Sequence, residues 1–153
     1  MTTEFSARLF AGDEDIRAIG TGLIARTLPR EAWTHEAHLG ACLWLLSERP
    51  DIDVDAEIAD IIRGFNESVG GVNDDHNGYH ETITQAYLAA IRAFVAALPP
   101  GTDDAEAVAR LLATPMGDKA WPLTYWSRER LFSVEARRAW VEPDLEPLPH
   151  PPT

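Results

Sequence analysis

Apolar residues recur at intervals of three and four along most of this chain, which is the spacing of one face of an α-helix. The pattern predicts four main helices, each ending near a Pro or a Gly pair that cannot continue it. Before the first helix, Phe5, Leu9 and Phe10 are candidate anchors for the lead-in. The expected main helices cover 13–27, 35–47, 54–67 and 79–97, with a shorter helix over 103–113.

The C-terminal third predicts shorter pieces of structure. Residues 114–132 combine turn residues with large aromatic rings, and residues 133–140 favour one last short helix. Residues 141–153 contain five prolines, which predicts an extended tail. No segment shows the period of two that is typical of a strand. We therefore expect an all-α fold in which residues 1–153 form a single helical domain. It would be a bundle of about four main helices with short C-terminal helices and the Pro-rich tail.

Composition narrows the class of protein. Hydrophobic residues make up 45% of the 153 residues, enough for a folded core. The net charge of −12 argues against binding to nucleic acid or to an anionic membrane, and no apolar run has the length of a membrane span. The sequence starts without the basic and apolar regions of a signal peptide. Because Cys42 is the single cysteine, no internal disulfide can form, and we expect a cytoplasmic protein.

Three histidines extend the apolar stripes towards the starts of two predicted helices. His35 and His38 lie on the inward stripe of the second main helix, for which Thr34 is a candidate N-cap. His80 lies three residues before Ile83, on the stripe of the fourth helix. We therefore expect these side chains to point inward and the two helix starts to face each other, so that they build one site.

A helix N-terminus is electropositive, and burial removes water, so both effects lower the pKa of an imidazole placed there. We expect the three histidines to be neutral at pH 7, the form that acts as a general base. The carboxylate beside His80 either orients an imidazole or complements the helix N-terminus. The catalytic candidates are His35, His38, His80 and Glu81.

Neighbouring polar and aromatic residues are candidates for substrate binding. Residues 69–77 are rich in Asn and Asp, which predicts a hydrogen-bonded loop that frames a ligand. Some candidates have a second interpretation: Trp33 as a packing residue at a helix start, Thr84 as a hydroxyl at the edge of the core. Tyr79 and Tyr87 are more typical of the core than of catalysis. The substrate-binding candidates are Trp33, Asn66, Asn73, Asp75, Tyr79 and Thr84.

The same histidines allow a metal-dependent alternative. His35, His38 and His80 offer three nitrogen ligands and Glu81 a fourth, a set that suits Zn, Fe, Mn or Ni. The spacing differs from the H-E-x-x-H motif, in which the two histidines are four residues apart. The leading hypothesis, acid/base chemistry, requires no cofactor, whereas this alternative requires a divalent metal.

Two longer motifs stand out in these regions: Trp33-Thr34-His35-x-x-His38-Leu39 and Gly78-Tyr79-His80-Glu81-Thr82-Ile83-Thr84. Shorter pieces accompany them at Phe65-Asn66, Asn73, Leu123-x-Tyr125-x-Ser127 and Ala136-Arg137. Through these pieces, over most of its length, the chain resembles an uncharacterised family of small helical bacterial proteins. The resemblance implies no established general activity. A weaker association of such proteins with natural-product pathways implies ring-closing steps such as aziridine formation.

Three hypotheses of function follow from the sequence. The first is an enzyme that performs acid/base chemistry on a small polar or anionic molecule, by cyclisation, elimination or transfer. The second is the metal-dependent protein. The third is a non-catalytic module that binds a ligand or partner, with the aromatic run 121–126 and the Pro-rich tail as exposed surfaces. A homodimer or a heteromeric pathway partner is compatible with each of them.

Overall fold

The computed structural model describes residue 10 and residues 12–152, so the expected anchors Phe5 and Leu9 lie outside the described residues. The described chain is all-α and contains no strand, which confirms the expected fold class. Its longer helices are α2 (Asp13–Ala25), α3 (His35–Glu48), α4 (Val54–Ser68), α5 (Glu81–Ala96) and α6 (Asp104–Leu112). Its short helices are η1 (Arg30–Ala32), η2 (Pro115–Gly117), η3 (Trp121–Thr124), α7 (Arg128–Leu131) and α8 (Val134–Arg138).

Side-chain caps set where the helices begin. Thr34 accepts a hydrogen bond from the backbone N–H of Ala37 at the start of α3, as its position predicts, and Asp53 caps α4 in the same way. Helix α5 begins two residues later than predicted because His80 is itself the N-cap. Its Nδ1 accepts the backbone N–H of Ile83. His80 therefore precedes the first turn, which corrects the position that the sequence pattern predicts for it.

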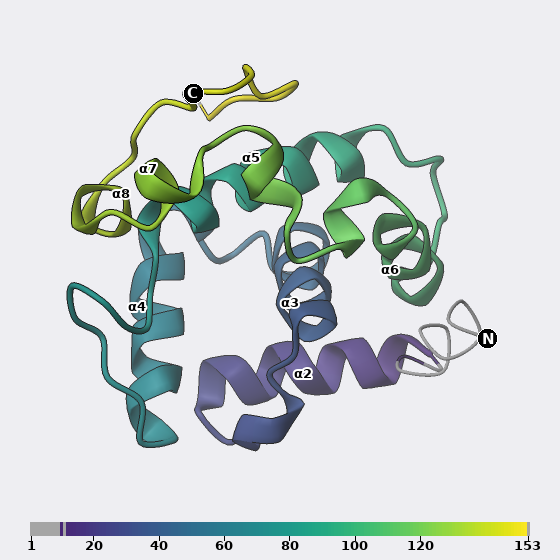
Figure 1. Cartoon of the computed structure of the whole chain (residues 1–153). Helices are drawn as coiled ribbons and strands as arrows, with labels where there is room; N and C mark the ends of the chain where they lie inside the picture. The colour runs from purple at the N-terminus through teal and green to yellow at the C-terminus, as the bar shows by residue number, and fades with distance from the viewer. Residues whose placement is uncertain (1–9, 11, 153) are drawn as a thin grey trace.

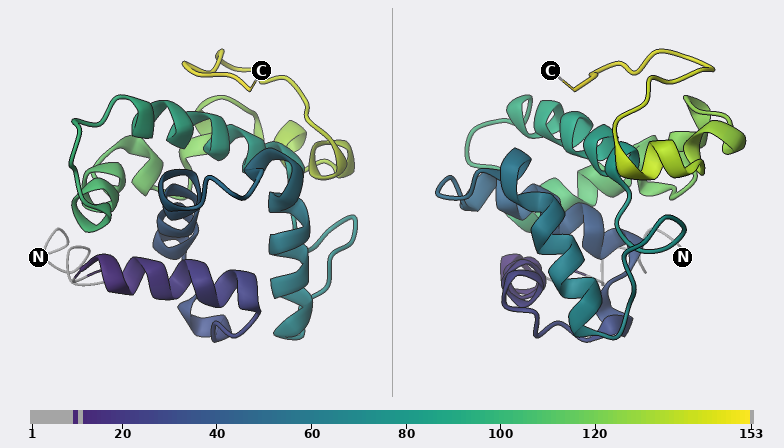
Figure 2. Two further views of the ribbon diagram at one scale, coloured as in Figure 1. Left: turned by 180° about the vertical axis from the view of Figure 1, so that it is seen from behind. Right: turned by 90° about the vertical axis from the view of Figure 1, so that its left-hand side faces the viewer.

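Helix α3 is the central element of the fold. It contacts α2, α5 and α6, while α2 also contacts α4. Figures 1 and 2 show these helices crossing one another in different directions, with α3 passing between α2 and α5. The C-terminal segment with α7 and α8 lies across the outer side of α5. Because α3 is surrounded in this way, it is apolar around most of its circumference rather than along one stripe.

The contact between α2 and α3 depends on one small residue. Trp44 of α3 is buried and packs against Gly20 of α2. A Cβ atom added at Gly20 would overlap the indole ring of Trp44. Glycine at this position therefore allows the two helices to approach each other closely.

The aromatic part of the C-terminal segment belongs to the core, whereas most of the Pro-rich tail is exposed. Trp121 and Trp126 are buried, and the indole N–H of Trp126 donates to the carbonyl of Val141 over 3.0 Å. In the tail, Val141 and Leu148 are buried, whereas Leu145 is exposed. The expectation of an exposed aromatic run at 121–126 is therefore wrong, because these rings fill the space over α5.

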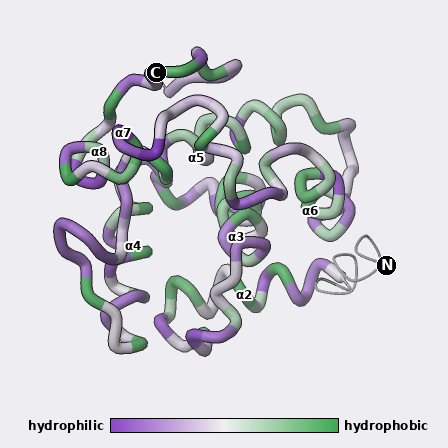
Figure 3. The backbone as a smooth tube through the Cα atoms, viewed as in Figure 1, coloured by the Kyte–Doolittle hydropathy of each residue, from purple (hydrophilic) through white to green (hydrophobic). Residues whose placement is uncertain are grey.

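Polar sequence collects at the outside of the fold. Figure 3 shows the loop between α4 and α5 as a hydrophilic stretch at the edge of the molecule. Over residues 12–152, no helix is both long enough and apolar enough to cross a bilayer.

Candidate functional site

A cavity of about 340 Å³ lies between α2, α3, α4 and α5, and the loop that carries Lys119 forms another part of its wall. Most of the wall is apolar and is made by side chains such as Leu23, Leu45, Ile58 and Ile91. A volume of this order suits a small organic molecule. The polar residues of the lining are His35, His38, Thr84, Tyr87 and Lys119.

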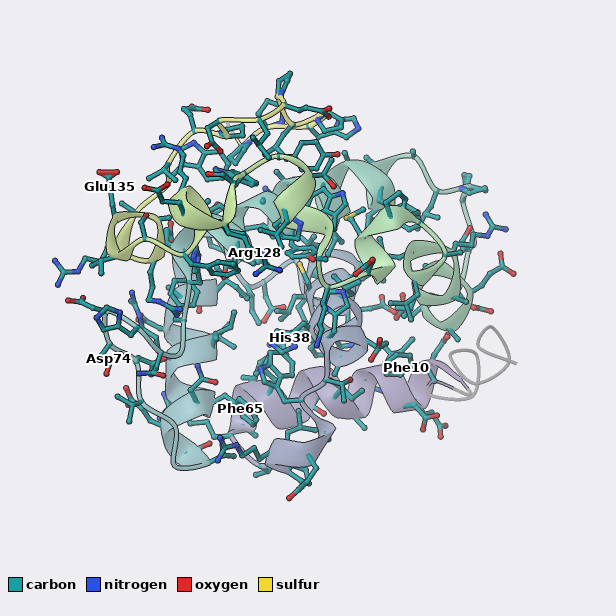
Figure 4. The ribbon with its side chains drawn as sticks, viewed as in Figure 1. Phe10, His38, Phe65, Asp74, Arg128 and Glu135 are labelled. Carbon is teal, nitrogen blue, oxygen red and sulfur yellow. The ribbon has the colours of Figure 1, made fainter. Side chains whose placement is uncertain are left out.

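His38 presents an oriented imidazole with one free nitrogen. Its Nδ1 lies 2.6 Å from the carbonyl oxygen of Thr34, and because a carbonyl can only accept, Nδ1 carries the proton. Nε2 is then unprotonated, and it has no hydrogen-bond partner among the described residues. The imidazole stacks on the indole of Trp33, with ring centroids 3.8 Å apart. Figure 4 places His38 in the middle of the molecule, whereas Asp74 and Glu135 lie at its outer edge.

His38 lines the cavity and keeps accessible surface. Its side chain is exposed by accessible area, yet loss of hydration within the surrounding protein lowers its pKa to about 4. The accessible area and the lowered pKa are compatible. A cavity of this size is large enough to admit water-sized molecules, while the surrounding protein encloses the rest of the imidazole ring. With its pKa lowered below its usual value, the imidazole is neutral at pH 7. This agrees with the expected neutral His38.

His35 and Tyr87 meet at another part of the wall. Nε2 of His35 donates to the carbonyl of Met116 over 2.9 Å, which leaves Nδ1 as the unprotonated nitrogen of the neutral ring. The ring of His35 lies edge-on to that of Tyr87, with centroids 5.8 Å apart. The hydroxyl of Tyr87 is the one buried side-chain polar atom in the described chain that lacks a hydrogen-bond partner. Burial raises the pKa of Tyr87, so this hydroxyl keeps its proton and is an enclosed donor without an acceptor.

Sequence reasoning missed Lys119 and assigned Tyr87 to the core. Lys119 is the only lysine of the chain, and its exposed side chain lies at the rim of the cavity. Its uniqueness is the signal that the sequence contained. Cys42 also lines the cavity, and burial raises the pKa of its thiol to about 12. The thiol is therefore not ionised at pH 7.

His80 does not line the cavity and serves a structural purpose. Its Nε2 donates to the carbonyl of Leu131 over 2.7 Å, and its Nδ1 accepts from Ile83. Both ring nitrogens are thus used, and burial lowers its pKa as expected. The structure brings His35 and His38 to one cavity but places His80 at the contact between α5 and the C-terminal segment.

The Gly-Tyr-His-Glu-Thr-Ile-Thr motif is mainly a junction with that same C-terminal segment. The hydroxyl of Thr82, which is fully buried, donates to the carbonyl of Ala139 over 2.9 Å. It also accepts the backbone N–H of Val141 over 3.2 Å. Within the motif, Ile83 and Thr84 are the residues that line the cavity. The motif therefore anchors the C-terminal segment with its first part and contributes to the cavity with its last two residues.

Glu81 is engaged with neighbours on its own segment. The hydroxyl of Tyr79 donates to Oε1 of Glu81 over 2.6 Å, and Gln85 donates to Oε2 over 3.3 Å. The guanidinium of Arg63 lies over the ring of Tyr79, 4.8 Å from its centroid. Neither Tyr79 nor Glu81 lines the cavity. Glu81 therefore does not orient His35 or His38.

The polar loop is hydrogen-bonded as predicted, but it does not frame the cavity. Nδ2 of Asn66 donates to Oδ1 of Asn73 over 3.1 Å, and the same oxygen accepts the backbone N–H of Tyr79 over 3.0 Å. Asp75 forms a two-point ion pair with Arg138 of α8, over 2.7 and 2.8 Å. These residues fasten the loop to its neighbours.

Trp33 separates two hollows. It lines the cavity, and it also lines a more open, polar pocket of about 570 Å³ together with Asn66 and Asn77. The structure supports both interpretations of Trp33: it packs on His38 at the start of α3, and it forms part of the cavity wall.

The ligand set of the metal hypothesis is not assembled. Within the described part of the chain, no group of three or more His, Cys, Asp or Glu side chains could hold a metal ion. His80 uses both ring nitrogens in protein hydrogen bonds, and Glu81 is held by Tyr79. His35 and His38 are left without the third and fourth ligands that the sequence predicts.

Comparisons with known proteins assign the chain to no family. No family model matches the chain, and no curated protein or solved structure shows significant similarity to it. The family resemblance carried by the two motifs therefore stays a prediction, and any assignment of function has to start from the cavity.

Proposed function

We propose that the protein is an enzyme that acts on a small molecule held in the cavity, with His38 as the general base. The observation that supports this proposal is the free Nε2 of a neutral, oriented imidazole that faces a ligand-sized cavity. General-base catalysis needs an unprotonated nitrogen within reach of a bound substrate, held in a fixed direction. The stacking on Trp33 and the hydrogen bond to Thr34 supply that direction.

The neighbouring groups fit a step in which a proton leaves the substrate and negative charge develops on it. Nε2 of His38 accepts the proton, and the carbonyl of Thr34 stabilises the resulting imidazolium through Nδ1–H. The unpartnered hydroxyl of Tyr87 can donate to the developing negative charge. The imidazolium then returns its proton, as an elimination, cyclisation or transfer requires. The residues invoked are those on the cavity, without His80 and Glu81.

The test compares small-molecule conversion by wild-type protein and by His38→Gln. Each protein is incubated with a cell extract of small metabolites, and mass spectrometry identifies compounds that are consumed and formed. We expect at least one compound to be converted by the wild type and about 10²-fold more slowly by His38→Gln, the order of a lost proton-transfer group. The matched control is His76→Gln, because His76 is exposed and does not line the cavity.

Equal conversion by wild type and His38→Gln would reject His38 as the base. A second function, binding without turnover, is favoured by the predominantly apolar wall of the cavity. In that case a ligand would bind to the wild type and to His38→Gln, and neither protein would convert it.

A further inference from the structure

The charges around the cavity are distributed unlike those of the rest of the protein. The chain has 25 Asp and Glu residues, yet no described Asp or Glu lines the cavity. Lys119, the single lysine, is the charged residue at its rim. A cation at the mouth of an apolar cavity attracts anions.

Three carboxylates outside the wall act on residues that line it, but none of them pairs with Lys119. The charge of Asp118 contributes to the raised pKa of Tyr87. The carboxylate of Asp118 accepts the backbone N–H of Ala120 over 2.9 Å. Asp55, near Cys42, is paired with Arg92 over 3.2 Å. The charge of Glu36, which does not line the cavity, acts to raise the pKa of His38. The ammonium of Lys119 has no ion-pair partner among the described residues.

The hydrogen-bonding capacity of Tyr87 also favours an anionic ligand group. The hydroxyl of Tyr87 is buried and unpartnered, and it retains its proton, so it offers a donor without an acceptor. Tyr87 and Lys119 line the same cavity, and the charge of Asp118, the chain neighbour of Lys119, acts on Tyr87. A carboxylate accepts hydrogen bonds and offers no donor, which matches a neutral donor next to a cation.

We propose that the cavity binds an organic carboxylate, whose apolar body contacts the leucine and isoleucine wall while its carboxylate pairs with Lys119 and accepts from Tyr87. This inference rests on the proposed function, since it names the substrate class of the same cavity. An amphipathic acid fits both parts of the wall, whereas a small, wholly polar anion would leave the apolar side chains without a partner.

Isothermal titration at pH 7 with three probes of equal chain length tests this inference: octanoate, 1-octanol and octylamine. The wild type is expected to bind octanoate about tenfold more tightly than 1-octanol, the sum of one surface ion pair and one hydrogen bond, and octylamine more weakly still. Lys119→Met should remove most of the preference for octanoate and leave the affinity for 1-octanol unchanged. Tyr87→Phe should weaken octanoate binding in the same direction.

Arg17→Met is the matched control, because Arg17 is exposed on α2 and does not line the cavity. It removes one positive charge from the protein and should leave all three affinities unchanged. Equal affinities for octanoate and 1-octanol, or no effect of Lys119→Met, would overturn the carboxylate inference while the cavity remains a ligand site.

The two proposals fail in distinguishable ways. If none of the three probes binds to the wild type, the cavity is not a ligand site for such molecules, and the carboxylate inference falls. If octanoate binds with the expected preference but His38→Gln converts every metabolite as fast as the wild type, the inference stands and the proposed function of His38 falls.

Discussion

The imidazole of His38 lies on the indole of Trp33 with ring centroids 3.8 Å apart and an angle of 29° between the ring planes. Trp33 in turn contacts Phe65 edge-on, with centroids 5.4 Å apart. The orientation of the proposed base is therefore set by an aromatic side chain that also forms the wall between the cavity and the neighbouring polar pocket.

Trp33→Ala should raise the pKa of His38 towards its usual value of 6.5. Removing the indole opens the cavity to water, which hydrates the imidazolium and reduces the loss of hydration that lowers this pKa. Trp33→Phe, which keeps a ring against His38, should raise it less. The measurement is an NMR titration of the histidine Cε1–H resonances. An unchanged pKa in Trp33→Ala would show that the indole does not contribute to the low value.

His80→Ala should destabilise the fold by about 2 kcal/mol, because it removes a helix cap and leaves the buried carbonyl of Leu131 without a donor. His80→Asn, with a side chain that caps helices well, should lose less. Urea unfolding at pH 7.5 measures both. If His80 were a catalytic group instead, the variants would lose activity at unchanged stability.

The wild type should also lose stability in acid through His80. Its folded pKa is lowered, so the unfolded state binds a proton first as the pH falls. This contribution is fully present above the unfolded pKa of 6.5 and is lost as the pH falls below it. Urea unfolding between pH 7.5 and pH 5 should show a smaller decrease in His80→Asn than in the wild type.

Asp104→Asn should stabilise the protein at neutral pH. Burial, with Glu48 next to it, raises the pKa of Asp104 to about 7, so its contribution to stability is present below pH 3.8 and is lost as the pH rises towards 7. We expect a gain of about 1 to 2 kcal/mol at pH 8 and none at pH 4. The control is Asp60→Asn, since Asp60 is exposed and should change stability little at either pH. A gain of equal size at both pH values would contradict the role of ionisation.

Gly20→Ala should destabilise the fold by about 3 kcal/mol, because the new methyl group overlaps the buried indole of Trp44 and pushes α2 away from α3. Thermal unfolding measures the loss. Gly12→Ala provides the comparison, since a Cβ at Gly12 meets no atom within 4 Å. Equal melting temperatures for the two variants would mean that α2 can shift at little cost.

Several features of the fold follow from the sequence alone. The starts of α2, α3 and α4 agree with the apolar spacing and with caps such as Thr34, because a helix start depends on residues within one turn of it. The neutral state of His38 was also predictable, since it follows from a position on the inward face of a helix start.

The composition of the site was decided by the tertiary structure. His80 and His38 show the same local pattern, but the carbonyl of Leu131, 51 residues further along the chain, occupies one nitrogen of His80. No residue near Lys119 in sequence indicates that its ammonium lies at the rim of a cavity whose wall comes from four helices. Helix boundaries depend on neighbours in the chain, whereas a free nitrogen, an unpartnered hydroxyl or an isolated cation depends on which distant segments pack against it. The sequence therefore determined the helices and the chemistry of the histidines, and packing decided which of them face the cavity.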